Sequence, residues 1–487
     1  MVDRLKFLKW ARDAEVEKHC LRRYRIYNYE PGHVRYQFGH YPTQKPYSPT
    51  EKDWELLDLY TEKGIEVIHV WHWNDLCGFF GKTVYEPLNE KGLRRFIDEC
   101  HRRKLKVIPY VSPGYLDVRN PIYRSEWSRG VGHLVEVYYD LDMLCPGSPG
   151  WRAYFFSVVD RMMDDYGFDG LYWDGGMGLE IPGCANSNTD HHIHFVEISP
   201  EKKRNVDHLD DAVKGKINEG YAALWNDFIC EIYTRVKKRG GLIVAHIGSD
   251  TPSPFKDKAW DYQLLGEGVP DILSSIEKTK FYEPYVIRFN DWSKLITNWK
   301  EKDFTPKLEL VPQIEHLSMA GSIPYLQFPW LEGGNYGEEE DIFNIPGVKW
   351  KKEYDVWTEW MKAQKKAGLS HLMGASFIGS RDRYFKYLDI YRQMTKGNTV
   401  AYLEVKEIKE NRPSFPLTEG KRRVSIFIND FLWVAIGNLG VNSQKVLVKS
   451  LEGKDEWKEV SLSPGALIIL RYHDLISPPE VLSFSEK

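Results

Sequence analysis

Two patterns of apolar residues alternate along most of the chain. Residues 51–63 place Trp54, Leu57 and Tyr60 on one face, the spacing of an amphipathic helix, and residues 65–72 follow as a largely apolar run, typical of a buried strand. Further strands are predicted at residues 33–40, 105–111, 242–247, 262–267, 323–328 and 372–378, and further helices at 89–104, 151–166, 221–238, 353–366 and 382–395. Repeated strand–helix units predict a parallel α/β sheet, and eight of them predict a closed (β/α)8 TIM barrel.

The remaining predicted strand ends at a carboxylate. The helix at 151–166 stops at Gly167, a residue type that commonly ends helices, and a short run of strand-forming residues then leads to Asp174 and two glycines. Side chains alternate along a strand, so Asp174 shares a face with Tyr172 and Gly170. A carboxylate at the carboxyl end of a buried strand is how a (β/α)8 barrel presents a catalytic acid. An Asp that only caps a tight turn fits the same pattern.

The pattern divides the chain into three parts. Residues 1–33 are predicted as an N-terminal arm, a short helix followed by an irregular segment, and residues 34–396 as the catalytic barrel. From residue 397 the helical spacing is lost, and short strands separated by turn residues predict a small antiparallel all-β C-terminal domain, a β-sandwich, over residues 397–487. The connection at 175–218 carries no clear element, and connections of this length are usually lids or binding loops.

Composition narrows the classes of function. The 487 residues carry a net charge of −4 with a pI near 6.5, which favours neither nucleic acid nor a membrane surface as a partner. The six cysteines show no CxxC spacing, the N-terminus is charged, and no run is long enough to span a bilayer; these features predict a cytoplasmic protein with reduced thiols. Aromatic residues make up 14%, among them 17 Trp, which favours a carbohydrate-binding cleft without establishing one. The oligomeric state is left open.

Two carboxylates are candidates for catalysis. Because alternate strands fill the same layer of a barrel, the ends of the fourth and sixth strands face one another, which selects Asp174 and Glu267. A glycosidase needs one ionised and one protonated carboxyl group, about 5 Å apart for retention or roughly 6.5–9.5 Å apart for inversion. Asp250, at the end of the fifth strand, is the alternative to Glu267. Asp169 points away from Asp174 near the start of its strand and is interpreted as structural.

The region around the fourth strand resembles a known family. The run Cys145-Pro-Gly-Ser-Pro-Gly-Trp151, followed by a strand that ends in Tyr172-Trp-Asp174, is similar to the barrel glycoside hydrolases of the α-galactosidase superfamily. The resemblance implies a barrel with a C-terminal β domain, with Asp174 as nucleophile and Glu267 as acid/base. Tyr172 stands where the α-galactosidases have a substrate-binding lysine. Glu267 stands where their acid/base is usually Asp, a pattern more like the endo-acting α-N-acetylgalactosaminidase relatives.

Aromatic and polar side chains gather near the predicted strand ends. A ring stacked on a pyranose face, with amide or carboxylate groups taking hydrogen bonds from the hydroxyls, would form a sugar subsite. Core tryptophans beside turn caps, and a satisfied core histidine, are the structural alternatives. The predicted substrate-binding residues are His72, Trp73, Asn74, Asp75, Tyr110, Tyr172, Trp173, His246, Asp250 and Arg288.

Two other classes of function stay open. The histidine cluster at 190–194, with His40, His72 and His246, could hold a metal in a metal-dependent barrel hydrolase, but the sequence has no HxH on the first strand and no HExxH helix. A non-catalytic carbohydrate-binding barrel has the same pattern of residues. We therefore expect no metal and no cofactor, and a retaining glycoside hydrolase that acts on an α-linked glycoside. Activity and chelator sensitivity separate the three classes.

Overall fold

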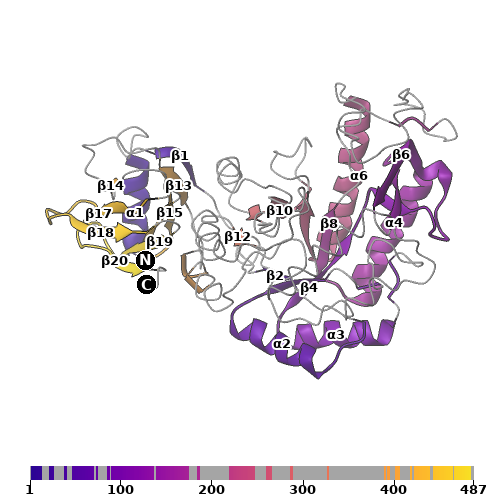
Figure 1. Cartoon of the computed structure of the whole chain (residues 1–487), viewed down its shortest axis with the longest axis horizontal. Coiled ribbons are helices and arrows are strands. Elements are labelled where there is room, and N and C mark those ends of the chain that lie inside the picture. Colours follow the sequence, from indigo (N-terminus) through magenta and orange to yellow (C-terminus); the bar gives the residue numbers. More distant parts are fainter. Residues whose placement is uncertain are drawn as a thin grey trace. The chain divides into compact units, whose positions relative to one another are not determined.

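The chain forms two compact units in a computed structural model (Figure 1). One unit comprises residues 38–265 and 330–361, and the other comprises residues 1–37, 266–329 and 362–487. The structure describes residues 2–13, 21–26, 38–40, 47–70, 73–74, 85–87, 89–136, 139–174, 184–186, 219–246, 259–265, 286–288, 326–327, 389–390, 392–394, 401–405, 417–418, 422–438, 442–463 and 466–483. The first unit is called the parallel unit below, and the second is called the antiparallel unit.

The parallel unit is built on one parallel sheet with helices between its strands. Its strands are β2 (Phe38–His40), β3 (Val67–Val70), β4 (Lys106–Val111), β8 (Gly170–Asp174), β9 (Leu242–His246) and β10 (Tyr262–Leu265), side by side in that order. Its helices are α2 (Glu51–Glu62), α3 (Glu90–Arg102), α4 (Pro149–Arg161) and α6 (Glu219–Lys238). The predicted alternation of strand and helix is confirmed over these elements. Closure of the sheet into a barrel stays a prediction, and the strand predicted at 372–378 lies outside the described residues.

The sequence explains where the helix before β8 begins and ends. Ser148 caps α4 by accepting a hydrogen bond from the backbone N–H of Trp151 (3.3 Å), and Pro149 occupies the first turn, where its missing N–H costs nothing. The helix continues as one π-helical turn, η2 (Met162–Tyr166), and stops at Gly167, whose φ of 82° lies in the left-handed region. The predicted end of this helix is therefore confirmed.

A small antiparallel sheet lies between β4 and α4 in the sequence, where the apolar pattern predicted no element. It comprises β5 (Tyr115–Asp117), β6 (Ser128–Glu136) and β7 (Tyr139–Leu144), in the order β5-β7-β6. The 3-10 turn η1 (Ser125–Trp127) leads into β6. Charged residues take buried positions in all three strands, so the strands lack the apolar pattern by which a strand is recognised from the sequence.

An aspartate fastens the start of strand β8, and another the start of strand β10, to the strand beside it. Asp169, just before β8, accepts a hydrogen bond from the backbone N–H of Val107 at Oδ2 (2.8 Å), and its own N–H donates to the Val107 carbonyl (2.8 Å). Asp261, just before β10, makes the same two contacts with Ile243 of β9 (2.8 Å and 2.9 Å). The side chains therefore continue the sheet's hydrogen bonding where the strands begin. This geometry agrees with the structural role inferred for Asp169.

The contact between His101 and Asp169 should make stability depend on pH. His101 Nε2 lies 2.8 Å from Asp169 Oδ2, and this hydrogen bond, the largest cause, raises the pKa of the half-exposed His101. A raised pKa means that the stabilisation is full below the unfolded value of about 6.5 and is lost as pH rises through the folded value. We expect His101→Asn to lower the free energy of unfolding by less than about 1 kcal/mol at pH 5.5, because solvent screens the pair, and by still less at pH 9. Urea unfolding of both proteins at both pH values measures this difference, and an equal loss at the two pH values would contradict it.

The antiparallel unit contains two sheets. The larger has the order β1-β13-β15-β16-β19-β20 and the smaller has the order β14-β17-β18. Their strands are β1 (Leu21–Ile26), β13 (Ala401–Val405), β14 (Leu417–Thr418), β15 (Arg422–Ile428), β16 (Leu432–Asn438), β17 (Gln444–Val448), β18 (Lys458–Leu462), β19 (Leu467–Tyr472) and β20 (Glu480–Ser483). The predicted antiparallel character of the C-terminal region is thus confirmed. A further pair, β11 (Val286–Arg288) and β12 (Leu326–Gln327), is parallel.

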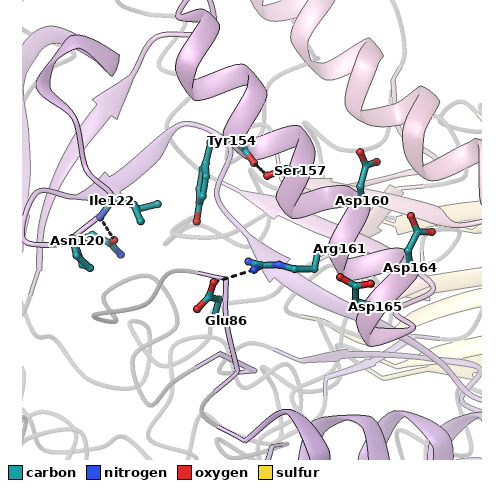
Figure 2. Close-up of a pocket in the computed structure, with 10 residues that line it drawn as sticks. Glu86, Asn120, Ile122, Tyr154, Ser157, Asp160, Arg161, Asp164 and Asp165 are labelled. Carbon is teal, nitrogen blue, oxygen red and sulfur yellow. Dashed lines mark hydrogen bonds and ion pairs between the residues drawn. The ribbon is translucent and has the colours of Figure 1, made fainter.

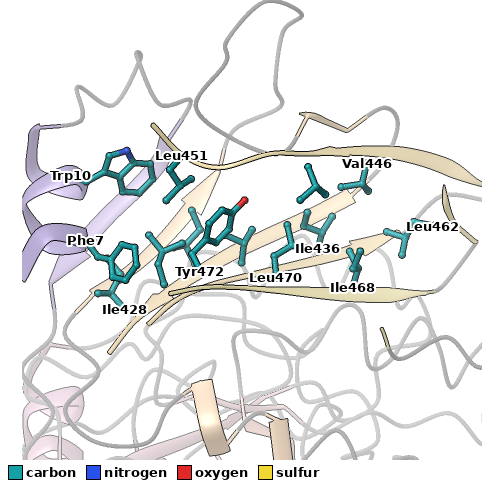
Figure 3. Packing of buried hydrophobic residues seen from close by; sticks show 14 of the residues in the cluster. Phe7, Trp10, Ile428, Ile436, Val446, Leu451, Leu462, Ile468, Leu470 and Tyr472 are labelled. Atoms are coloured by element: carbon teal, nitrogen blue, oxygen red, sulfur yellow. The ribbon is translucent and has the colours of Figure 1, made fainter. Parts of the chain in front are cut away.

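The N-terminal segment joins this all-β part of the chain. Helix α1 (Val2–Asp13) contributes Phe7 and Trp10 to a hydrophobic core that includes Ile428, Leu470 and Tyr472 (Figure 3). Strand β1 pairs antiparallel with β13. The predicted short helix is therefore present, but an ordered strand replaces the irregular segment that was expected after it. The strand was missed because three of its six residues are arginines, a composition typical of a solvated segment. The predicted domain boundaries stay predictions.

Candidate active site

One predicted catalytic carboxylate lies at the carboxyl end of the parallel sheet. Asp174 is the last residue of β8, and its side chain is 24% exposed. The strand register pairs Asp174 with His246 of β9 and pairs Tyr172 with Tyr110 of β4. Because residues in register share a face of the sheet, these four side chains gather on one face, above three adjacent strands. We call Tyr110, Tyr172, Asp174 and His246 the Asp174 cluster.

Both carboxylate oxygens of Asp174 have a partner in this cluster. Tyr110 Oη donates a hydrogen bond to Oδ2 (2.9 Å), and His246 Nδ1 lies 3.2 Å from Oδ1. The two partners come from the strands on either side of β8, so the carboxyl group is fixed from both directions. His246 is only 7% exposed, which strengthens its interaction with the carboxylate relative to the same pair in water. The arrangement holds the Asp174 carboxylate in one orientation.

The geometry also favours one protonation state of the His246 ring. Nδ1 lies 3.1 Å from Tyr172 Oη as well as 3.2 Å from the Asp174 oxygen. A protonated Nδ1 can donate towards both oxygens, whereas a bare Nδ1 would set its lone pair against the carboxylate. We therefore infer that Nδ1 carries a proton when Asp174 is ionised. Tyr172 and Asp174 together fix the orientation of the ring.

A second histidine lies beneath the cluster and was missed by the sequence analysis. His69 of β3 is fully buried, and its ring centroid lies 4.1 Å from that of Tyr172. The register pairs His69 with Ile108, two residues before Tyr110, so it faces the same side of the sheet. The signal for it was a polar residue on the cluster's face of the predicted strand, one position before the end of β3.

The predicted tryptophans take core positions instead. Trp73 is fully buried, and its Nε1 donates to the Tyr110 carbonyl (2.9 Å). Trp173 is 1% exposed, lies on the face of β8 opposite to Asp174, and packs edge-on against Trp260. The structure therefore does not bring these two rings together with the Asp174 carboxylate, and their positions match the structural alternative. Asn74 is likewise buried, at 1% exposure.

The other predicted site residues cannot be placed against the cluster. Arg288 ends β11 in the antiparallel unit, where only its backbone is described. The remaining predictions, which include the acid/base and its rival, lie outside the described residues: His72, Asp75, Asp250 and Glu267. The histidine cluster predicted at 190–194 also lies outside them. Within the described part of the chain, no three His, Cys, Asp or Glu side chains come together as a metal site would require.

A separate pocket lies on helix α4 and the π-helical turn (Figure 2). Its volume is about 480 Å³. Two of its lining residues, Arg161 and Glu86, form an ion pair (2.9 Å). Burial raises the pKa of Tyr154, which also lines the pocket, to about 12. It shares no residue with the Asp174 cluster. The lining residues are Glu86, Asn120, Pro121, Ile122, Tyr154, Ser157, Asp160, Arg161, Asp164 and Asp165.

One protein-family model matches part of the chain. A family model described as "Domain of unknown function (DUF6259)" matches residues 41–207. This range holds β3, β4 and β8, with Tyr110 and Asp174, but covers less than half of the chain. A search of curated proteins finds no match. Within the described helices, none has both the length and the apolar character needed to cross a bilayer.

Solved structures with a similar fold include carbohydrate-active proteins. A trehalulose synthase variant in complex with Tris has a TM-score of 0.53 at 12% identity, covering 93% of this chain and all of that one. An Anoxybacillus alpha-amylase has a TM-score of 0.50 at 12% identity, covering 90% of this chain and 98% of that one. An alpha-galactosidase from Geobacillus stearothermophilus reaches a TM-score of only 0.47 at 11% identity, covering 94% of this chain and 57% of that one, which is too low to support an argument. At these identities the likeness concerns the fold alone.

Proposed function

We propose that this protein is a glycoside hydrolase that cleaves an α-linked glycoside with retention of configuration. The observation that carries the proposal is the Asp174 carboxylate at the carboxyl end of β8, fixed by Tyr110 Oη at 2.9 Å and His246 Nδ1 at 3.2 Å. Active sites of parallel α/β sheets lie at this edge, and a retaining enzyme needs a carboxylate held in position to attack. The similarity to a solved alpha-amylase and a trehalulose synthase supports a carbohydrate substrate, and a closed barrel is part of the proposal.

The reaction would proceed in two displacements. Asp174 attacks the anomeric carbon while a carboxylic acid, for which we propose Glu267, protonates the departing glycosidic oxygen. The same group, now ionised, then takes a proton from water, which attacks the glycosyl ester and releases Asp174. An ionised carboxylate has about four lone-pair positions, so the two contacts from Tyr110 and His246 leave an oxygen lone pair for attack.

The residue at position 172 bears on which sugar the protein accepts. The resemblance to α-galactosidases puts a lysine where this chain has Tyr172, and here the Tyr172 hydroxyl lies 3.1 Å from His246 Nδ1. A neutral phenol engaged in this way offers a substrate hydroxyl less charge than a free ammonium group would. We therefore propose the wider class of α-glycosides rather than galactosides in particular.

The proposal is tested with a panel of nitrophenyl glycosides. The α- and β-anomers of glucose, galactose, mannose and N-acetylgalactosamine derivatives should be compared under the same conditions. Proton NMR of the first-formed product then reports its anomeric configuration before mutarotation. We expect hydrolysis of at least one α-glycoside with an α-configured first product. Hydrolysis of β-glycosides alone, or a β-configured product from an α-glycoside, would contradict it.

Removing the Tyr110 hydroxyl should lower turnover more than substrate binding. Tyr110→Phe deletes a hydrogen bond to the Asp174 carboxylate, which leaves the nucleophile less well oriented. Hydrogen bonds to charged groups are worth about 1.5–3 kcal/mol, so we expect kcat to fall roughly 10- to 100-fold with little change in KM. Steady-state kinetics on the best substrate of the panel measures both.

Tyr123 provides a matched control for this substitution. Its hydroxyl donates to Asp142 Oδ2 (2.6 Å), a bond of the same kind outside the Asp174 cluster. Tyr123→Phe should change thermal stability but leave kcat within twofold or so of the parent, because it touches no proposed catalytic group. Equal losses of kcat in the two variants would indicate a general structural effect and contradict the role of Tyr110.

A further inference from the structure

Two buried thiols from distant parts of the sequence lie side by side in the parallel unit. Cys145 is fully buried and Cys184 is 1% exposed, and neither is in a disulfide. The two thiols are near enough that Cys184 raises the pKa of Cys145, and both raise the pKa of the buried Tyr221 of helix α6. Cys145 lies between β7 and α4, whereas Cys184 lies in the connection that follows the Asp174 strand.

Both cysteines are attached to the same short stretch of chain. The backbone N–H of Cys145 donates to the Trp127 carbonyl (2.8 Å), and the Cys184 thiol lies 3.9 Å from the Ser128 carbonyl. Ala185 donates from its N–H to the Arg129 carbonyl (2.7 Å). Consecutive residues of this stretch therefore hold the two sulfurs close together.

Segment 184–186 is docked on residues 125–129 by hydrogen bonds. Besides the Ala185 bond, Asn186 Nδ2 donates to the carbonyls of Ser125 (2.8 Å) and Ser128 (3.0 Å). Cys184 and Ala185 are buried, and local opening of such a short segment costs less than unfolding of the core elements. Opening of this segment would expose both thiols to solvent without unfolding the sheet.

The surroundings keep the Cys145 thiol protonated while the segment is docked. Burial, the largest cause, raises the pKa of Cys145, and the Cys184 thiol raises it further. The Arg129 guanidinium, itself fully buried over the Tyr221 ring at 4.6 Å, opposes this effect without reversing it. The thiolate is the reactive form, so reaction requires opening of the segment.

We propose that Cys145 and Cys184 form a reversible disulfide that fastens Cys184, after the Asp174 strand, to the residue that follows strand β7. A low-molecular-weight disulfide is the oxidant. One cysteine thiolate attacks it and releases one small thiol, and the second cysteine thiolate then attacks the mixed disulfide, forms the Cys145–Cys184 bond and releases the second small thiol. The two cysteines lose two protons and two electrons, and the two small sulfurs gain them. This modification site is independent of the proposed hydrolase activity.

Oxidation of the folded protein with glutathione disulfide tests the site. We expect an intact mass lower by two hydrogens and a proteolytic peptide in which Cys145 is joined to Cys184. Cys100 and Cys230 serve as internal comparators, because the first is buried and the second is partly exposed, and neither should join this bridge. Cys145→Ser and Cys184→Ser should each abolish the bridge, with circular dichroism confirming that both variants are folded. Dithiothreitol should restore the original mass.

Two further readouts separate this site from accidental oxidation. Because the thiolate attacks, the rate of bridging should rise about tenfold per pH unit between pH 7 and 8. The bridged protein should unfold at a higher temperature than the reduced protein, and neither serine variant should show this gain. A folded protein that stays unbridged while its denatured form oxidises would overturn the proposal. A persistent glutathione adduct on either cysteine, or a bridge to another cysteine, would do the same.

Discussion

Asp174→Asn is expected to lower kcat/KM by at least about 1,000-fold while leaving the fold intact. The amide has nearly the shape of the carboxylate and can still accept the hydrogen bond from Tyr110 Oη. It is neutral, however, so it neither attacks the anomeric carbon nor stabilises the positive charge that develops there. Kinetics on the best α-glycoside, together with circular dichroism and a thermal melt, would measure the loss and verify folding.

A control and an independent observation accompany this substitution. Asp165→Asn makes the same chemical change at an exposed position on the π-helical turn, outside the Asp174 cluster, and should leave the rate unchanged. A 2-deoxy-2-fluoro glycoside should trap the glycosyl-enzyme, and peptide mass spectrometry should locate the adduct on Asp174. Substantial activity in the Asp174 variant, or an adduct on another residue, would remove Asp174 as the nucleophile.

Glu267→Ala should impair poor leaving groups far more than good ones. A general acid typically contributes about 100- to 10,000-fold, and it matters most when the departing oxygen is strongly basic. We expect losses in that range for alkyl or disaccharide substrates and much smaller losses in the first step for activated aryl glycosides. The two kinds of substrate should be compared in parent and variant at one pH.

Two further measurements, with azide and with the Asp250→Ala variant, decide which carboxylate is the acid/base. A small anion can attack the glycosyl-enzyme without a general base, so azide should accelerate the second step of Glu267→Ala on activated substrates and yield a glycosyl azide. Asp250→Ala should show neither the leaving-group dependence nor the rescue. The reverse pattern would assign the acid/base to the end of the fifth predicted strand and leave the role of Asp174 untouched.

The backbone of the candidate site followed from local patterns in the sequence. Strands β4, β8 and β9 lie within one or two residues of their predicted positions, because buried parallel strands are short apolar runs with clear breaks at each end. The side-chain alternation placed Tyr172 and Asp174 on one face, and the register with β9 adds His246. Local periodicity therefore suffices to locate a carboxylate at a strand end.

The parts that sequence spacing leaves open depend on contacts between distant residues. Trp73 and Trp173 resemble sugar platforms in the sequence, but a ring is a platform only if it lies on the open face, and here one donates to a backbone carbonyl and the other packs on Trp260. The role of His69 beneath Tyr172 depends on the register between strands, which sequence spacing does not give. The small sheet before α4 was missed because charged residues occupy buried positions in its strands and break the apolar pattern.

Strands β8 and β9 approach so closely at Gly170 that amino-acid substitutions there should be read as a test of strand spacing. Gly170 begins β8 opposite Leu242 at a φ of 152°, and a Cβ built on it would lie 1.9 Å from the Leu242 carbonyl oxygen. The same register pairs Asp174 with His246 four residues later, so any side chain at position 170 would wedge apart the two strands that carry this pair. In a saturation library scored by activity, position 170 should therefore behave like a catalytic position and tolerate no replacement, although its residue never meets the substrate. Intolerance to substitution at position 170 would then reflect the close approach of strands β8 and β9. It would not show that residue 170 takes part in catalysis.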